Sequence, residues 1–256
     1  MPLFPLLNEN EKIETVNENI KLISKKDGLT FGTDAYLLAA YVARSPSSLA
    51  VDLGSGTGIL PLLLLARKKI QKAVAVEVQE SFCDLIDRNA ALNGMSDNIE
   101  TLCSDVRDLP SGALAAECAE LVLSNPPYMT ADSGKANASD AKFIARHEVL
   151  GDISDFCRTA ASLLKYGGKF YCVYRPDRLA DLICAMRTHK LEPKRMTLVH
   201  ATAASAPSMV LVEAKKGAAP SLVLTRPLLL TDAGGNQTED ARRIYEIGSF
   251  EDFLKR

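Results

Sequence analysis

Five short apolar segments that alternate with helical patterns constrain the fold of this chain more than any other feature. The segments SLAVDL, KAVAVEV, NIETLCSDV, AELVLS and KFYCVYR have the length and composition of buried strands. Helical patterns of 11 to 16 residues, such as ILPLLLLARKK and QESFCDLIDRNAALNG, lie between several of them. Strands that alternate with helices form βαβ units. The sequence therefore predicts a doubly wound α/β fold, in which helices cover both faces of a mostly parallel sheet.

Two later segments, PKRMTLVHA and SMVLVEAKK, extend this pattern. No helical stretch separates them, and consecutive strands without a crossover pair in an antiparallel manner. We therefore expect a seven-stranded sheet with an antiparallel strand at one edge. A helix over residues 152–166 is expected to precede KFYCVYR and to end at Gly167-Gly168.

The two ends of the chain have weaker patterns. NIKLIS predicts a short strand and TFGTDAYLLAAYVAR predicts a helix with Thr33 as its N-cap, and together they form an N-terminal extension over residues 1–45. Near the other end, two prolines and a Gly-Gly pair interrupt regular structure. We expect one domain over residues 1–217 and an extended tail over residues 218–256.

The composition excludes several classes of protein. With 256 residues, 47% apolar residues and a net charge of −2, the chain is typical of a globular protein and not of a globally basic nucleic-acid binder. It lacks the apolar run of about 18 residues that a membrane-spanning helix requires, and its first residues lack the basic start of a secretory signal. The six cysteines form no CxxC pair, so we expect reduced thiols, no metal site and a cytoplasmic location.

One local stretch is nevertheless basic. From Lys165 to Arg195 there are eight Lys or Arg residues against three Asp or Glu. Such a stretch either holds the phosphates of a nucleic acid or forms a solvated helix face.

A glycine-rich loop, VDLGSGTG, joins the first strand of the sheet to the following helix. Gly54, Gly56 and Gly58 allow a sharp turn and a close approach of the backbone to a ligand. Dinucleotide-binding loops follow the pattern G-x-G-x-x-G, whose third glycine packs the helix against the sheet. Here Ile59 occupies that third position, which argues against a dinucleotide.

Acidic residues end three consecutive predicted strands, at Asp52, Glu77 and Asp105. The carboxyl ends of neighbouring parallel strands line one ligand-binding edge, where Glu77 can accept both hydroxyls of a ribose and Asp105 can reach the exocyclic amine of an adenine. Several acids without a phosphate-cradling loop favour a cofactor with a positive centre. S-adenosylmethionine fits, because it carries a ribose, an adenine and a sulfonium. The alternative is that each acid caps a helix or a surface turn.

The stretch SNPPYMT follows the predicted strand AELVLS. Proline lacks the N–H that a strand ladder needs, so Pro126 and Pro127 end the strand in a rigid turn. The Asn125 side-chain oxygen and the Pro126 main-chain oxygen can accept hydrogen bonds from one NH₂ group and stabilise the charge that develops on its nitrogen. Tyr128 offers a ring on which a planar substrate can stack. We interpret these four residues as a catalytic clamp; the alternative is a proline-rich turn with its aromatic ring in the core.

Together, VDLGSGTG and SNPPY resemble the class I amino-methyltransferases of nucleic-acid bases and glutamine amides, which have a Rossmann-like fold. FGTDAYLLAAYV, VEVQ, IARHEV, ASLLKYGGKFYCVYRPDRL and LEPKRMTLVH resemble, more narrowly, the bacterial tRNA adenine-N(6)-methyltransferase family that modifies valine tRNA next to the anticodon. The resemblance covers roughly residues 18–217. It implies transfer of a methyl group from S-adenosylmethionine to the exocyclic amine of adenine in RNA, with tRNA as the partner.

The same resemblance implies which residues form the site. It assigns the target-base clamp to Asn125, Pro126, Pro127 and Tyr128. It assigns the cofactor pocket to Phe31, Thr33, Asp34, Asp52, Gly54, Gly56, Gly58, Glu77, Asp105 and Asn125.

Two segments near the clamp carry no assigned chemistry. MTADSGKANASDAKF is polar and typical of a flexible lid, and the triplet Arg146, His147 and Glu148 that follows it either orders the lid or contacts RNA. The loop ATAASAPS is small and nearly uncharged, whereas members of the family often carry a basic or amide-rich loop there.

Four other functions fit parts of the pattern. A glutamine-amide methyltransferase of release factors shares the NPPY clamp but carries a helical domain before the glycine loop, and only 53 residues precede Gly54 here. A DNA adenine methyltransferase needs a recognition domain, for which residues 129–256 leave little room. An rRNA guanine-N(2) methyltransferase uses a related clamp, and the sequence does not exclude this function. A catalytically silent RNA-binding module would not need the intact acids and clamp. The oligomeric state is not predicted.

Overall fold

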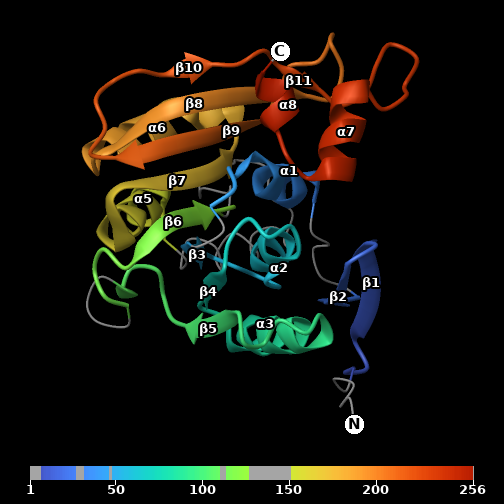
Figure 1. Ribbon diagram of the computed structural model, residues 1–256, viewed down its shortest axis with the longest axis vertical. Coiled ribbons are helices and arrows are strands. Elements are labelled where there is room, and N and C mark those ends of the chain that lie inside the picture. Colours follow the sequence, from blue (N-terminus) through green and yellow to red (C-terminus); the bar gives the residue numbers. More distant parts are fainter. Residues whose placement is uncertain (1–6, 27–31, 46–47, 110–113, 127–150, 256) are drawn as a thin grey trace, which may run out of the picture.

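A mixed sheet forms the centre of the molecule (Figure 1). The computed structural model describes residues 7–26, 32–45, 48–109, 114–126 and 151–255. Over these residues the sheet has nine strands, in the order β10–β8–β9–β7–β6–β3–β4–β5, with β11 also paired to β8. Its strands are β3 Leu49–Leu53, β4 Lys72–Glu77, β5 Ile99–Cys103, β6 Ala119–Ser124, β7 Leu164–Tyr174, β8 Leu191–His200, β9 Pro207–Lys216, β10 Val223–Leu224 and β11 Leu228–Leu229. The predicted α/β fold with a mostly parallel sheet is confirmed.

The position of the antiparallel strand differs from the expectation. β9 pairs antiparallel with both β7 and β8, so it lies inside the sheet and not at its edge. The chain leaves β7, crosses through a helix and forms β8 one strand further out, and β9 then folds back into the gap between them. Beyond β8, the short strands β10 and β11 of the tail continue the sheet in parallel, which takes it past the seven strands expected.

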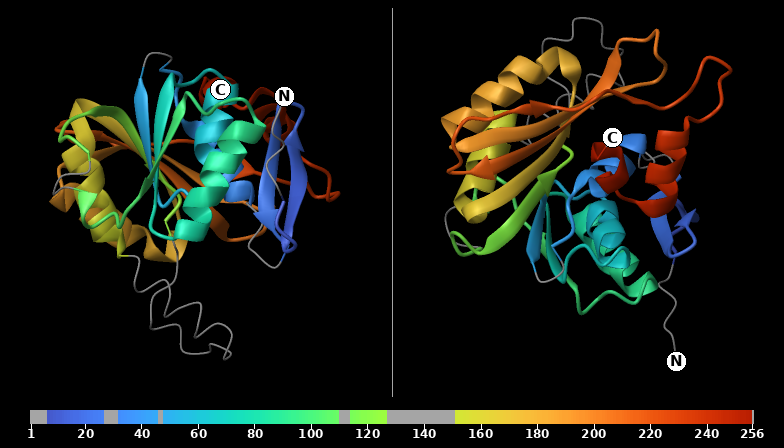
Figure 2. Two further views of the ribbon diagram at one scale, coloured as in Figure 1. Left: turned by 90° about the horizontal axis from the view of Figure 1, so that it is seen from below. Right: turned by 45° about the horizontal axis from the view of Figure 1, so that its top comes forward.

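Helices cover both faces of the sheet (Figure 2). The residues of β3 alternate between two apolar clusters: Ala50 packs on the side of α1, α2 and α3, whereas Val51 and Leu53 pack on the side of α5 and α6. Both faces are therefore buried, as the apolar strand sequences predict. The helices are α1 Thr33–Tyr41, α2 Ile59–Ala66, α3 Glu80–Leu92, α5 Ile153–Leu163, the 3₁₀ turn η2 Pro176–Arg178 and α6 Leu179–Thr188.

Two predicted helix ends are wrong. α1 has Gly32 as its N-cap and Thr33 as its first helical residue, because the chain reaches the helix one residue earlier than the threonine signal suggests. α5 ends at Leu163, and Gly167 and Gly168 lie within β7. A Cβ atom on Gly168 would lie 3.1 Å from the Glu120 carbonyl oxygen of β6, so this glycine permits close packing of β7 against β6 and does not end a helix.

The N-terminal segment forms a hairpin apart from the main sheet. β1 Glu11–Asn17 pairs antiparallel with β2 Ile20–Lys25 and with no strand of the large sheet. β2 matches the strand predicted at NIKLIS, whereas β1 was not expected. The hairpin lies beside α3 (Figure 1).

The tail is folded and not extended. Besides β10 and β11 it forms α7 Glu239–Ile247 and α8 Glu251–Leu254, which lie on the side of the sheet that carries α1 (Figure 1). Five of its apolar side chains are almost fully buried in the core: Leu228, Ala241, Ile244, Phe250 and Phe253. The predicted extended tail is therefore wrong. Burial of these apolar side chains stabilises the folded tail, whereas an extended tail would leave them in water.

Local signals at both ends of α7 explain why it forms. The Thr238 hydroxyl accepts a hydrogen bond from the Ala241 amide at 3.2 Å and caps the helix. Gly248 adopts a left-handed conformation (φ 66°) just after the last turn and ends it.

Candidate functional site at the switch point of the sheet

The sequence-predicted loop and clamp lie on neighbouring strands. From β3 the chain proceeds outward to β4 and β5 on one side, and then returns to β6 and β7 on the other. Asp52 of β3 stands opposite Leu123 of β6. Gly54 and Asn125, each two residues further on, therefore leave the sheet side by side, about 5 Å apart as neighbouring strands are. Such a switch point is where open α/β sheets bind ligands.

The glycine loop adopts a conformation that side chains disfavour. Gly56 (φ 57°) and Gly58 (φ 79°) are left-handed. A Cβ atom on Gly58 would lie 3.3 Å from Ile86 of α3, whereas one on Gly56 would meet nothing within 4 Å. The loop thus packs closely against the protein at Gly58 and leaves open space beside Gly56, where a ligand can approach the backbone.

Glu77 joins the glycine loop to the next turn. One carboxylate oxygen accepts the Gly56 amide at 2.9 Å, and the other accepts the amides of Val78 and Gln79 at 3.0 Å each. A carboxylate offers about four lone-pair positions, so one acceptor position remains after these three bonds. Binding two ribose hydroxyls, as the sequence predicts, requires one backbone partner to be exchanged.

Asp52 is a buried carboxylate with an unused oxygen. It is 1% exposed, and its Oδ2 accepts a hydrogen bond of 2.6 Å from the Ser55 hydroxyl. Its Oδ1 is buried and has no hydrogen-bond partner in the described part of the chain. Burial raises the pKa of Asp52 to about 7. A donor or a positive group at Oδ1 would relieve this unfavourable state.

Asp105 follows the end of β5 and is already paired. Its carboxylate accepts the Arg107 amide at 2.8 Å and two guanidinium N–H groups at 2.9 and 2.5 Å. The Arg107 guanidinium lowers the pKa of this carboxyl. The contact of Asp105 with an adenine stays a prediction. The ion pair with Arg107 disfavours it, because this carboxylate already accepts three hydrogen bonds.

The described part of the clamp is anchored to both neighbouring elements. The Ser124 hydroxyl donates to the Leu53 carbonyl at 2.7 Å and ties the end of β6 to β3. The Asn125 side-chain NH₂ donates to Asp34 Oδ2 at 3.0 Å. Pro126 is buried. Three predicted residues, Phe31, Pro127 and Tyr128, lie outside the described residues, and so does the triplet Arg146–Glu148.

A cavity of about 260 Å³ adjoins this clamp through Asp34. It opens between the start of α1, the end of β7 and the start of β9, and its walls are Thr33, Asp34, Tyr174, Arg175, Ser208 and Met209. The structure thus brings Thr33 and Asp34, predicted at the cofactor, to the clamp side of the switch point.

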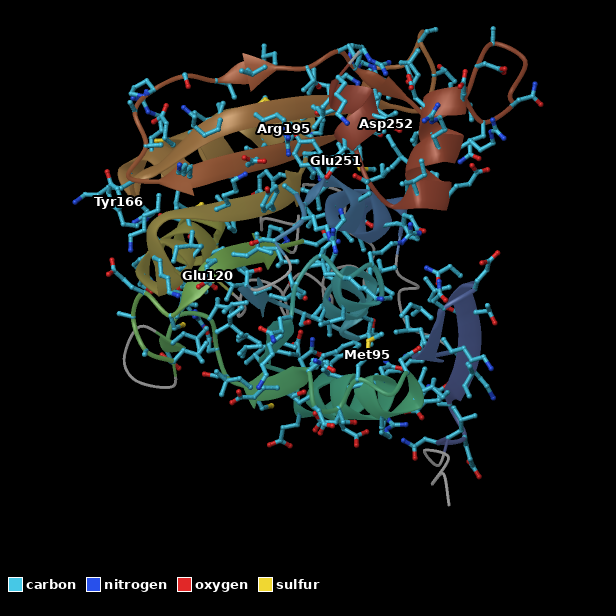
Figure 3. The ribbon with its side chains drawn as sticks, viewed as in Figure 1. Met95, Glu120, Tyr166, Arg195, Glu251 and Asp252 are labelled. Atoms are coloured by element: carbon cyan, nitrogen blue, oxygen red, sulfur yellow. The ribbon has the colours of Figure 1, made fainter. Side chains whose placement is uncertain are left out.

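The basic stretch does not form one cationic patch. Of its eight Lys and Arg residues, six are ion-paired with carboxylates, for example Lys165 with Glu120 and Arg195 with Glu213. Figure 3 shows Glu120 of β6 and Arg195 of β8 well apart, so these two ion pairs do not lie next to each other.

Within the part of the chain that is described, no helix could span a membrane. Nor do these residues include a group of three or more side chains that could hold a metal ion.

The sequence pattern of the methyltransferase small domain matches residues 25–186, from β2 through α6. The chain belongs to the methyltransferase small domain family. The sequence-based prediction of a methyltransferase with a Rossmann-like fold is thereby confirmed, and a catalytically silent module is disfavoured.

Several relatives of this methyltransferase carry the name tRNA1(Val) (adenine(37)-N6)-methyltransferase. The protein from Porphyromonas gingivalis is 28% identical over 185 residues, which cover 70% of this chain and 71% of the relative. The protein from Pectobacterium carotovorum is 30% identical over 176 residues, which cover 63% of this chain and 69% of the relative.

Solved structures agree in fold. A predicted O-methyltransferase from Agrobacterium tumefaciens superposes with a TM-score of 0.70 at 25% identity and covers 85% of this chain and 97% of its own. Geranyl diphosphate C-methyltransferase from Streptomyces coelicolor, solved with S-adenosyl-L-homocysteine, reaches a TM-score of 0.52 at 13% identity over 71% of this chain and 78% of its own. The latter likeness is one of fold alone.

The candidate site also contains one residue that the sequence analysis did not single out. Asn89 of α3 is fully buried, and its side-chain NH₂ donates to the Thr57 carbonyl of the glycine loop at 3.0 Å. The signal was an asparagine on the apolar face of a predicted helix, where asparagine is disfavoured unless its amide is satisfied.

Proposed function

We propose that this methyltransferase transfers the methyl group of S-adenosylmethionine to the exocyclic amine of adenine in tRNA, at position 37 of valine tRNA. One observation carries the proposal. Asn125 follows β6 two residues after Leu123, and Leu123 is the register partner of Asp52, which stands two residues before the first glycine of the loop. A methyl donor bound at the loop and an amine bound by Asn125 would therefore meet at the switch point. The names of the two relatives support tRNA adenine as the acceptor.

The residues around the glycine loop fit S-adenosylmethionine. The buried Oδ1 of Asp52 has no hydrogen-bond partner among the described residues, so a positive group nearby would stabilise it, and the cofactor offers an ammonium and a sulfonium. Gly56 leaves space at the loop for a ligand to contact the backbone. Gly54 and Gly58 shape the same turn, and Glu77 stands beside it for the ribose.

S-adenosylmethionine, when bound, supplies a methyl group on a positively charged sulfur. The chain's own task is then to make an amine nitrogen nucleophilic. Its lone pair is delocalised into the base, and acceptors on both N–H groups favour the form in which that lone pair is available. Asn125 Oδ1 and the Pro126 main-chain oxygen would accept those two hydrogen bonds and stabilise the positive charge that develops on the nitrogen.

The clamp also has to hold a planar base. Tyr128 would stack on it, a contact worth about 1–3 kcal/mol per base, and Pro127 would keep the ring in place. After transfer the nitrogen is acidic and releases its proton to solvent, so this scheme requires no base from the protein. An unpaired base in a loop costs least to extrude from its stack, which fits an anticodon loop.

The test is mass spectrometry of nucleosides from total tRNA and rRNA of cells with and without the gene, followed by purified protein with valine tRNA. We expect loss of N6-methyladenosine from tRNA in the deletion strain and its return with the wild-type protein. Asn125→Ala should fail to restore it, because loss of one preorganised group of this kind lowers the rate by about 10²–10³-fold. Loss of a methylated guanine, or a methylated glutamine in protein, would instead identify one of the rival functions.

A further inference from the structure

Asp34 holds the Asn125 amide in one orientation. We propose that Asp34 is a positioning residue of the clamp, which acts on the amine through Asn125, and not a cofactor ligand. The inference rests on the proposed function, because it assigns a role within the same methyl-transfer site. Its basis is the hydrogen bond of 3.0 Å from the Asn125 NH₂ to Asp34 Oδ2.

The direction of this hydrogen bond follows from chemistry. An ionised carboxylate only accepts hydrogen bonds, whereas an asparagine amide has an NH₂ that donates and an oxygen that accepts. If the Asn125 amide were flipped, two oxygens would stand about 3 Å apart and repel each other. Asp34 therefore selects the rotamer in which the NH₂ of Asn125 faces α1 and its oxygen faces the other way.

Only that rotamer can serve the clamp. An amine substrate presents N–H groups, so it needs the Asn125 oxygen; an Asn125 NH₂ in the same place would oppose a donor with a donor. The negative charge of Asp34 also polarises the amide and strengthens its oxygen as an acceptor, since hydrogen bonds in series reinforce one another.

Asp34 is itself held firmly. It lies in the first turn of α1, where a carboxylate is favoured by the helix dipole, and its Oδ1 accepts the Ala35 amide at 2.9 Å. Gly32 leaves room for it, because a Cβ atom on Gly32 would lie 2.5 Å from that same oxygen. The sequence GTDA, residues 32–35, thus forms a helix start that holds one aspartate in a fixed orientation.

The first test is a double-mutant cycle on the single-turnover rate of methyl transfer to valine tRNA. Asp34→Ala should lower the rate about 10–100-fold, the range for outer partners that orient a ligand residue, with unchanged affinity for S-adenosylmethionine. Asp34→Asn should lower it less, because an amide can still accept through its oxygen. In the Asn125→Ala background, Asp34→Ala should change the rate by less than about threefold, because residues that act as a unit are not additive.

Additive effects would overturn the inference, and so would a loss of cofactor affinity in Asp34→Ala with an unchanged rate, which would make Asp34 a cofactor ligand. Asp240→Asn is the matched control. Asp240 is also an aspartate in the first turn of a helix, where it pairs with Arg226 at 2.5 Å, and this variant should methylate tRNA like the wild type.

A second readout needs no substrate. The side-chain NH₂ signal of Asn125 in a ¹⁵N–¹H NMR spectrum, identified by its loss in Asn125→Ala, should shift in Asp34→Asn and stay in place in Asp240→Asn. An Asn125 signal that ignores Asp34→Asn would overturn the inference. A wild-type protein that shows this response but does not methylate tRNA would refute the proposed function alone.

Discussion

The hairpin β1–β2 and the tail after β9 are attached to the same side of the molecule by different forces. The hairpin buries Ile20 and Leu22, but its register on α3 is set by hydrogen bonds and one ion pair. These contacts are Arg88 to Glu11, Asn89 to Ile23 and Asn93 to Lys21. The tail is held mainly by burial of aromatic and aliphatic side chains, with Phe250 against Tyr41 at 5.1 Å between ring centres. Directional bonds fix a position, whereas apolar burial supplies more free energy.

The two extensions also contact different parts of the candidate site: the hairpin reaches the glycine loop through Asn89, and the tail contacts the helix that carries Asp34. The hairpin shares Asn89 with the glycine loop, because that side chain bonds both Ile23 and Thr57. The tail contacts α1, the helix that carries Asp34, since the Tyr36 hydroxyl donates to the Tyr245 carbonyl at 2.8 Å. We therefore expect changes in the hairpin to affect the cofactor side, and changes in the tail to affect stability first. Figure 3 shows Glu251 and Asp252 of α8 on the side occupied by α1.

The largest expected effect is the loss of an aromatic anchor of the tail. Phe250 is 1% exposed and also contacts Phe253 edge to face. Phe250→Ala should lower the free energy of unfolding by about 3–5 kcal/mol, the cost of truncating a buried phenylalanine, as measured by urea denaturation. Ile247→Ala, in the same tail but 50% exposed, should change it by less than about 0.5 kcal/mol. Equal small effects in both variants would mean that the tail is a loose appendage.

This fold of the tail shows what sequence patterns convey and what they leave out. The strands of the sheet could be predicted because each apolar run and the following helix carry their own period. The tail was expected to be extended because glycines and prolines interrupt its sequence at several positions. Between these positions, Thr238, Gly248 and the apolar residues at 241, 244 and 245 form the pattern of a short amphipathic helix, and burial of its apolar side decides the fold of the tail.

In the candidate site, too, some residues carry local sequence signals, whereas other contacts depend on the fold. Glycines that need left-handed backbone and an asparagine before two prolines are local signals, so Gly56, Gly58 and Asn125 could be named from the sequence. The bond between Asp34 and Asn125 joins residues 91 positions apart, and it exists only because the fold brings the start of α1 to the residue that follows β6. No local pattern could indicate it. The contact of Asp105 with Arg107, two residues further on, is a local turn, which the sequence offered only as an alternative to a ligand contact.

The second prediction concerns the shared contact of the hairpin. Asn89→Ala leaves the Ile23 amide and the carbonyls of Ile23 and Thr57 without their buried partner. The free energy of unfolding should fall by about 2–3 kcal/mol, the scale of the penalty for unsatisfied buried groups. Affinity for S-adenosylmethionine, measured by calorimetry on the folded variant, should fall as well, because Thr57 belongs to the glycine loop. Unchanged affinity would separate the hairpin from the cofactor side.

The third prediction concerns pH. Hydrogen bonding to Arg88 lowers the pKa of Glu11 from its ordinary value of 4.5 to about 2. Because the folded value is the lower one, this carboxylate stabilises the fold fully above about pH 5, and its contribution is lost as the pH falls through about 2.

Glu11→Gln should therefore lower the free energy of unfolding by about 1.5–2 kcal/mol at pH 7, the scale of a charge-assisted hydrogen bond. The difference from the wild type should vanish toward pH 2. Glu14→Gln is the control. Among the described residues, Glu14 on the same strand pairs with the exposed Lys12 alone, and surface pairs contribute about 0–1 kcal/mol. A constant difference across the acid range would show that the Arg88 pair is not its source.

The smallest expected effect makes the sharpest comparison, because Asn89 lies in α3 and Asn93 caps the end of the same helix one turn later. Asn93 accepts the Lys21 amide at 3.0 Å and donates to the Lys21 carbonyl at 2.8 Å, so it grips the hairpin as Asn89 does. It lies nearer to solvent, where water can replace the lost bonds, and Asn93→Ala should lower the free energy of unfolding by only about 1 kcal/mol. Its contacts do not include the glycine loop among the residues described, so cofactor affinity should stay at the wild-type value. If Asn93→Ala weakened the cofactor as much as Asn89→Ala, the hairpin as a whole would act on the loop, and the bond from Asn89 to Thr57 would not be the link.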